Sequence, residues 1–416
     1  MELIKKKLPR VLLIVATLAI MFHTFTYTNK VANSQIKNDA YWHTHETLVK
    51  IDEGTFGFKD LFTLRSSVDQ VAPVYRLTLI FNAWWFDLDF KYEAFLGLLF
   101  SAFILLLIFH YVKKRCHFPN PWIEMVALLA IAIITFSLAN SNRYFWPLIT
   151  YFALPLFFNI CLMVYYEKRW KSGTAKQWYL LAISVFAVLV ISDGMGLVTT
   201  LALLATSTLL LIESRNRKQR LALMSAVVLG ASAYLLAKGM ISTMPLRDVA
   251  PSMSEKLSLV FSDTGAAIAA FFQGWSQAIV GNGLIAKWFG KESIWIASLI
   301  IGVFFFLTST INVFFYCKRQ LHSSGMLPLY ILAFISIFTL TVMVNRTHFT
   351  GILSVLSPRY SIFYELITVA NLIMLYRLLF TDEGMIKRFQ KPATAAVLLI
   401  TMAILLLQYN YAQHAW

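Results

Sequence analysis

Charged side chains are scarce in this sequence. Only 14% of its 416 residues are Asp, Glu, Lys or Arg, whereas 58% are hydrophobic and the mean hydropathy is +0.66. A soluble domain carries about 25% charged residues. So few charges cannot cover the surface of a water-soluble globule of this size, and the composition therefore predicts a chain embedded in lipid.

Cysteines and the motifs of soluble enzymes are also scarce. The three cysteines, Cys116, Cys161 and Cys317, lie far apart in the sequence and close to the predicted cytoplasmic ends of apolar runs. This placement argues against a disulfide framework and against a metal site built from paired cysteines. The sequence also lacks a phosphate-binding glycine loop, an HExxH pair and a G-x-S-x-G turn, so the chemistry of those motifs is not expected.

Positive charge is in excess, with a formal net charge of +15. Many basic residues stand in short clusters between apolar runs, which is the pattern of cytoplasmic loops in membrane proteins. A lipid bilayer rather than nucleic acid is therefore the expected partner. The first apolar run, Val11 to Thr28, is longer than the core of a signal peptide and has no cleavage site close behind it, so we interpret it as a retained first span.

The apolar runs predict the fold class, an all-α polytopic membrane protein with about eleven transmembrane helices. A span needs about 20 mostly apolar residues, and the candidates are 9–28, 92–112, 122–140, 145–166, 177–193, 195–213, 221–240, 294–317, 327–344, 360–380 and 393–410. The Lys and Arg residues of the short loops place the N-terminus in the cytoplasm. Residues 1–416 then form a single integral membrane domain with two long external loops, 29–91 and 241–293.

The two long loops contain amphipathic or apolar stretches of their own. In the first loop, Ala40 to Ile51 and Val74 to Phe86 are rich in aromatic residues and are predicted as interfacial helices, with a short helix starting at Lys59 between them. In the second loop, Ala266 to Ala278 is predicted as a re-entrant or interfacial piece. We find no internal repeat and no linker between soluble domains.

Polar residues capable of chemistry gather on the predicted external side. Carboxylates are concentrated in the first loop, and the later external edges carry Arg143, Asp193, Arg346, His348, Arg359 and Tyr360. A carboxylate can deprotonate an acceptor hydroxyl, and arginines hold phosphate through bidentate hydrogen bonds. This distribution suits an enzyme that binds an anionic lipid head group.

Short motifs along nearly the whole chain carry a family resemblance. They are Asp39-Ala-Tyr-Trp42, Glu53-Gly54, Lys59-Asp60-Leu-Phe62, Asp69-Gln70, Arg76-Leu77, Ser192-Asp-Gly-Met-Gly-Leu197 and Ser357-Pro-Arg-Tyr360. Together with the loop topology, they resemble the GT-C superfamily of bacterial membrane glycosyltransferases that use polyprenyl-phosphate sugars, including the phage-type glucosyltransferases that modify O-antigen. The chain departs from the pattern at Asp69-Gln70-Val71, where relatives carry Glu-His-Arg, and no large soluble domain follows the last span.

The resemblance implies a catalytic base in the first external loop. Asp39 is the first candidate, because it follows the first span closely, and Asp69 is the second. The implied substrate-binding residues are Arg76, Arg143, Asp193, Arg346, His348, Arg359 and Tyr360. Such residues also have plain structural explanations, since an Asp at a helix start is an N-cap and an interfacial Arg reaches toward lipid phosphate. No metal ligands are assigned; the sequence requires no cofactor and leaves a divalent metal open.

The implied function is the transfer of a sugar, such as glucose, from a polyprenyl-phosphate-sugar donor to a periplasmic glycan acceptor such as O-antigen or lipopolysaccharide. This hexosyltransferase is expected in the bacterial inner membrane with its active site on the periplasmic side. Two alternatives stay open. An O-antigen polymerase or ligase also has many spans, although its large loop tends to lie late in the chain. A flippase or transporter for lipid-linked oligosaccharides predicts ionisable residues deep in the spans and broken helices, and the sequence shows few such charges.

Overall fold

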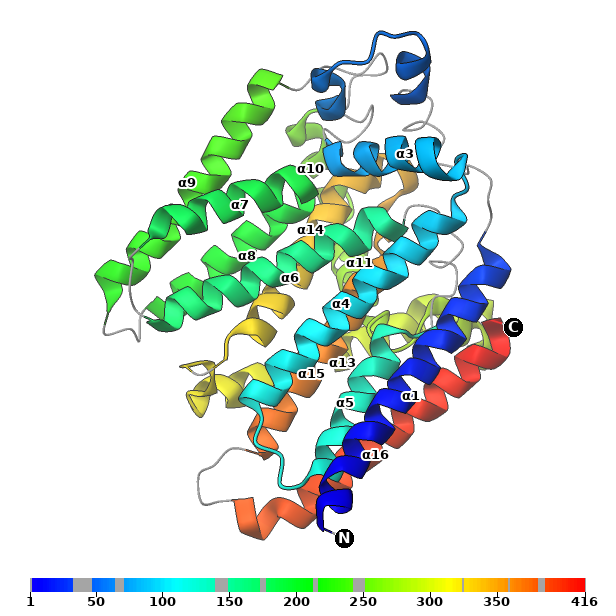
Figure 1. Cartoon of the computed structure of the whole chain (residues 1–416), viewed down its shortest axis with the longest axis vertical. Helices are drawn as coiled ribbons and strands as arrows, with labels where there is room; N and C mark the ends of the chain where they lie inside the picture. The colour runs from blue at the N-terminus through cyan, green and yellow to red at the C-terminus, as the bar shows by residue number, and fades with distance from the viewer. Residues whose placement is uncertain are drawn as a thin grey trace.

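The described chain is built from helices. The computed structural model describes residues 2–32, 47–63, 71–138, 149–172, 177–211, 216–241, 251–323, 325–357, 360–380 and 386–415, and no strand occurs among them. The α-helices in Figure 1 are α1 (Glu2–Val31), α3 (Pro73–Phe86), α4 (Lys91–Arg115), α5 (Pro121–Thr135), α6 (Ile149–Ser172), α7 (Trp178–Ser192), α8 (Gly194–Leu211), α9 (Arg217–Ile241), α10 (Met253–Phe261), α11 (Thr264–Ser276), α12 (Asn282–Phe289), α13 (Ile294–Lys318), α14 (Leu327–Thr350), α15 (Ser361–Leu379) and α16 (Ile386–Ala415). Four short 3-10 helices are η1 (Phe58–Phe62), η3 (Lys291–Ser293), η4 (Leu321–Ser323) and η5 (Ile352–Leu356).

Eight helices in the described ranges are long and apolar enough to cross a membrane, so the chain is a multi-pass membrane protein. They coincide with the predicted spans 9–28, 92–112, 195–213, 221–240, 294–317, 327–344, 360–380 and 393–410. The other three predicted spans fall on α5, α6 and α7. Both α5 and α7 have only 15 residues, which is about 22 Å of helix against a hydrocarbon core of about 30 Å, and the last turns of α6 carry several charges. The count of eleven therefore stays a prediction.

The second long loop contains a broken helix pair. Together α10 and α11 are long and apolar enough for a span, but they are bent by 92° where they meet. Asp263 starts α11 as an N-cap, because its carboxylate accepts a hydrogen bond from the Ala266 amide at 2.9 Å. The re-entrant or interfacial piece predicted at 266–278 falls on α11, and the bend is compatible with a broken span or a re-entrant loop.

Helix α3 lies across one end of the bundle instead of running along it (Figure 1). Its inner face is buried, with Leu79 inaccessible to solvent, whereas Trp84 and Trp85 on the outer face are 71% and 70% exposed. A helix with one buried face and one exposed aromatic face fits the predicted interfacial placement, which stays a prediction.

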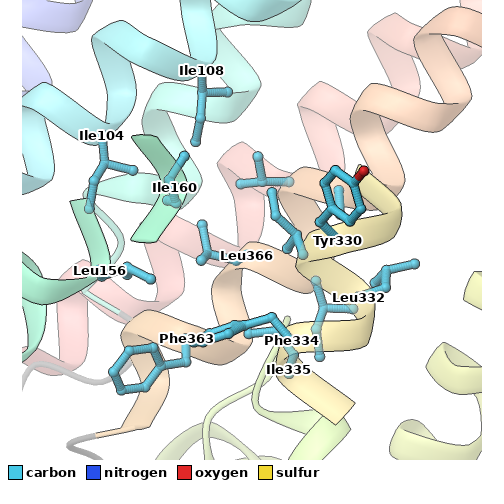
Figure 2. Packing of buried hydrophobic residues seen from close by; sticks show 14 of the residues in the cluster. Ile104, Ile108, Leu156, Ile160, Tyr330, Leu332, Phe334, Ile335, Phe363 and Leu366 are labelled. Carbon is cyan, nitrogen blue, oxygen red and sulfur yellow. The ribbon is translucent and has the colours of Figure 1, made fainter. Parts of the chain in front are cut away.

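The core lies where α4, α6, α14 and α15 meet. In α15, 83% of the apolar window is buried, more than in any other of the eight candidate spans, so α15 is the central helix. Figure 2 shows how branched and aromatic side chains of these four helices interlock: Ile104, Ile108, Leu156, Ile160, Tyr330, Leu332, Phe334, Ile335, Phe363 and Leu366. The polar residues Glu365, Thr368 and Asn371 of α15 are therefore held inside the protein.

The two ends of the bundle differ in charge and in the helices that cover them. The basic end comprises the ends of α4, α6, α13 and α15 and the starts of α5, α9 and α14; there Lys113 lies 3.6 Å from Glu124. The loop end is the opposite end, where α3 covers the starts of α4 and α6 and Tyr75 packs edge-on against Tyr151. The basic segments predicted to share one side of the membrane are thus gathered at one end of the bundle.

Two helix pairs touch through a glycine. A Cβ atom on Gly302 of α13 would collide with the backbone carbonyl of Phe272 in α11, and one on Gly230 of α9 would collide with that of Ala182 in α7. Lipid chains give no hydrophobic drive for association between helices, so close backbone contact at small residues is a main source of attraction.

Gly302→Ala is expected to push α13 away from α11 and to lower the free energy of unfolding by about 1–3 kcal/mol, the usual cost of overpacking. Thermal unfolding of the purified protein in detergent measures this change. Gly239→Ala in α9 is the matched control, because a Cβ there meets no atom within 4 Å. A Gly302→Ala protein as stable as this control would contradict the close contact.

Candidate functional site

The loop end contains the predicted site residues whose side chains the structure describes. These are Arg76, Asp193, Arg346 and Tyr360. For His348 the structure describes the backbone, within α14, and not the side chain. The remaining predicted residues, Asp39, Asp69, Arg143 and Arg359, lie outside the described residues.

Asp193 forms the turn between α7 and α8. Its backbone has a φ of +38°, which non-glycine residues seldom adopt, and its side chain is only 2% exposed. The carboxylate accepts hydrogen bonds from the Val71 amide (2.8 Å), the Tyr234 hydroxyl (2.7 Å) and, through both oxygens, Lys238 Nζ (3.0 Å). A carboxylate has about four lone-pair sites, so these bonds occupy its acceptor capacity. Asp193 thus holds three segments together, and in this state it has no oxygen left for a sugar hydroxyl.

Arg76 of α3 holds the end of η1. The residue is 1% exposed, and its Nη1 donates to the carbonyls of Asp60 (3.0 Å), Leu61 (3.1 Å) and Thr63 (2.7 Å). The last carbonyls of a helix have no partner within the helix, and a cation stabilises them. The sequence interpretation assigned Arg76 to substrate; the structure places it as a cap.

These two anchors lie on either side of residues 64–70. Thr63, just before that segment, is bound by Arg76, and Val71, just after it, is bound by Asp193. Asp69 belongs to this segment, two positions before Val71. Arg76 and Asp193, which are both candidates from the sequence, therefore bind the first long loop on the two sides of the same segment.

Tyr360 and Arg346 lie at the loop ends of α15 and α14. The Tyr360 side chain is 4% exposed and packs edge-on against Phe152 and Phe338, with ring centroids 6.2 and 5.5 Å away. Arg346 is half-buried in the last turns of α14. The aromatic cluster fixes the start of α15 against α6 and α14.

Two buried glutamates near the loop end were not chosen from the sequence. Glu93 of α4 is 2% exposed, and Asn82 Nδ2 of α3 donates to its carboxylate at 3.4 Å. Glu365 of α15 is 4% exposed. Their positions near the external ends of predicted spans indicate partnered or interfacial carboxylates; both are buried, and Glu93 has Asn82 as a partner. The signal that was available is a single carboxylate inside a long apolar run, which is costly in lipid and marks a candidate functional site.

Glu167 of α6 organises the basic end and was also not predicted. The residue is 1% exposed, and its Oε2 accepts hydrogen bonds from the amides of Met326 (2.8 Å) and Leu327 (2.9 Å) at the start of α14. Arg115 (3.1 Å) and Lys171 (2.6 Å) pair with its other oxygen. A carboxylate at a helix N-terminus satisfies free amides and the positive end of the helix dipole, so Glu167 caps α14 from another helix.

The described ranges contain no group of three or more His, Cys, Asp or Glu residues placed to hold a metal ion. Comparison with known proteins found no matching protein family, no matching curated protein and no matching solved structure. The function must therefore be argued from the residues themselves.

Lys238→Met is expected to lower the free energy of unfolding by roughly 3–5 kcal/mol, because it leaves the buried Asp193 carboxylate without its cation. Thermal unfolding in detergent measures the loss. The matched control is Lys113→Met, whose pair with Glu124 is partly exposed and should contribute at most about 1 kcal/mol. Equal losses in the two variants would contradict an anchoring role for the Asp193–Lys238 pair.

Acid is expected to loosen the η1 region. Burial raises the pKa of Asp60, but hydrogen bonds from Lys50 and the Gly57 amide and the charges of Lys50 and Arg76 together bring it below its ordinary value. A carboxyl with a lowered pKa stabilises the fold above its ordinary pKa, and this stability is lost as the pH falls through the folded value.

Hydrogen exchange of residues 47–63, corrected for the intrinsic effect of pH, should therefore show opening in acid. Asp60→Asn should expose the same region already at neutral pH and remove most of the acid dependence. An unchanged acid response in that variant would assign the effect to another group.

Proposed function

We propose that this chain is a glycosyltransferase that moves a sugar, such as glucose, from a polyprenyl-phosphate sugar to a glycan such as O-antigen or lipopolysaccharide. The proposal places the protein in a bacterial inner membrane, with the basic end and the N-terminus in the cytoplasm. The loop end then faces the periplasm and contains the active site. The gathering of basic helix ends at one end of the bundle supports this proposed orientation.

The observation that carries the proposal is the double anchoring of the first long loop. Asp193 holds the Val71 amide and Arg76 holds the Thr63 carbonyl, at a cost of burying two charges. Buried charges in a membrane protein are expensive and are kept where they serve a purpose. The bound residues flank the segment 64–70, which contains Asp69 in the sequence, and bound flanks on both sides support a general base in this part of the loop.

The proposed reaction is a single displacement at the anomeric carbon. The carboxylate of Asp39 or Asp69 takes the proton from an acceptor hydroxyl, and the oxygen forms a bond to that carbon. The bond from the carbon to the phosphate oxygen breaks, and polyprenyl phosphate leaves with the electron pair. Arg346, Arg143 and Arg359 are the proposed phosphate ligands, because guanidinium groups stabilise charge that develops on a leaving phosphate. His348 and Tyr360 complete the proposed substrate set.

Lipid-linked oligosaccharide transport is the second candidate function. Transporters place ionisable residues and broken helices inside the membrane, and the described chain has the buried Glu365 and the 92° bend between α10 and α11. The sequence argument against transport, that few charges lie deep in the spans, is weaker once Glu365 and Glu93 are known to be buried.

Purified protein in liposomes is expected to transfer sugar from a synthetic polyprenyl-phosphate sugar to a lipopolysaccharide acceptor. Replacing the base, Asp39→Asn or Asp69→Asn, should reduce the rate about 10²–10⁴-fold, the usual contribution of general base catalysis. Asp52→Asn is the matched control, since Asp52 is an exposed carboxylate of the same loop, and it should keep the wild-type rate.

Each outcome of this assay is informative. Loss of transfer in one Asp variant at normal protein level identifies the base, and full activity in both overturns the site assignment but keeps the enzyme. If the wild type transfers nothing from glucosyl or other hexosyl donors, the transferase proposal fails. Movement of a fluorescent lipid-linked oligosaccharide across the same liposomes would then support the transporter, and chain lengthening of O-antigen would support the polymerase.

A further inference from the structure

Glu365 separates two small cavities inside the bundle. It lies in the second turn of the central helix α15, and it is the one residue that lines both cavities. The first cavity lies toward α4, α5 and α6, and the second lies toward α16 and the chain after α11. Each has room for about one water molecule. The carboxyl group of Glu365 is therefore placed between two sites of water size.

The first cavity offers acceptors of hydrogen bonds. Its other polar side chains are Ser101 and Thr135, and their hydroxyls donate to the carbonyls of Gly97 (3.0 Å) and Ile131 (2.9 Å). A hydroxyl has one proton, so once that proton is donated it presents lone pairs. Oxygen atoms that all present lone pairs repel unless a hydrogen lies between them. A water molecule in the cavity, or a proton on Glu365 itself, is suited to supply such a hydrogen.

The second cavity continues the polar path from the other side of Glu365. Thr368 donates to the Ala278 carbonyl at 2.6 Å, and Ser137 donates to Gln408 Oε1 at 2.9 Å. Gln277 and Gln408 add amide groups, which both donate and accept. A water here finds the two to four polar partners that a buried water needs.

Within the part of the chain that the structure describes, Glu365 is the only charged residue that lines either cavity. On the neighbouring α16, Tyr411 is a titratable group that acts electrically on Glu365. Its hydroxyl donates to the Ile279 carbonyl at 3.0 Å and accepts from the Gly281 amide at 2.8 Å. On α15 itself, Arg377 lies three turns away at the basic end.

We propose that Glu365 is a proton-binding site inside the membrane domain and that water in the two cavities carries protons to and from it. Protonation converts the carboxylate into a neutral acid whose O–H faces the acceptor oxygens of the first cavity, and release returns the proton to cavity water. No other reactant is needed. The site is independent of the proposed transferase activity, and it supplies the feature that proton-coupled membrane proteins use, a buried acid reached by water.

Infrared difference spectroscopy of the protein in lipid tests the site directly. As the pH is raised stepwise, the carbonyl band of a protonated carboxylic acid should disappear, and the band should shift in D2O because cavity water exchanges its proton. Glu365→Gln should lack this band. Glu93→Gln, which alters another buried glutamate near the same end of the bundle, should retain it.

Two further measurements keep the test decisive if Glu365→Gln does not fold. Labelling of glutamate carbons with 13C in the wild type shows whether the titrating band belongs to a glutamate, and Ser101→Val, which fills the first cavity, should slow the shift in D2O. A titrating, exchanging band that depends on Glu365 supports the site. An ionised Glu365 at every pH tested, or a band that never exchanges in D2O, would overturn it.

Discussion

Carboxylates buried between helices govern how this protein holds together. Lipid offers no hydrogen bonds, so each buried polar group must find its partners within the protein. Glu167 meets this need with the amides that start α14 and with two cations, and Asp193 meets it with Lys238, Tyr234 and an amide of the first long loop. One carboxylate fixes the basic end, and the other fixes the loop end. The positions of α3, α6, α9 and α14 depend on these bonds.

The same constraint explains the glycine before α14. A Cβ on Gly325 would collide with the guanidinium of Arg377 and crowd the hydroxyl of Tyr111. Arg377 in turn donates to the hydroxyl of Tyr316, which donates to the Gly325 carbonyl at 2.6 Å. The absence of a side chain at residue 325 allows the cap of α14 and the arginine of α15 to share one small volume. The charge of Arg377, its hydrogen bond and the close packing around residue 325 are thus accommodated in the same place.

The sequence predicted the apolar helices well, because hydropathy is a local property that each run shows by itself. The gathering of basic helix ends at one end of the bundle was readable for the same reason. The count of spans was not readable, since α5 and α7 end after 15 residues and only the surrounding helices decide how short helices sit.

The candidate site was predicted by residue type but not by role. Asp193 binds Val71, 122 residues earlier in the chain, and no local pattern contains that pairing. Glu365 was not among the predicted site residues, because sequence shows how far a residue lies from the end of a helix, not which face of the helix it occupies.

The distances in sequence between partners have a consequence for biosynthesis. A ribosome delivers this chain to the membrane from the N-terminus, so the turn at Asp193 is made 45 residues before Lys238. Glu167 is made 159 residues before the Met326 amide that it caps. Until α14 emerges, the first half of the protein contains a carboxylate without its final partners. A nascent or truncated chain that lacks α14 therefore keeps Arg115 and Lys171 as cations beside Glu167, but its Oε2 lacks the two amides that it caps, so the basic end is complete only after α14 has been made.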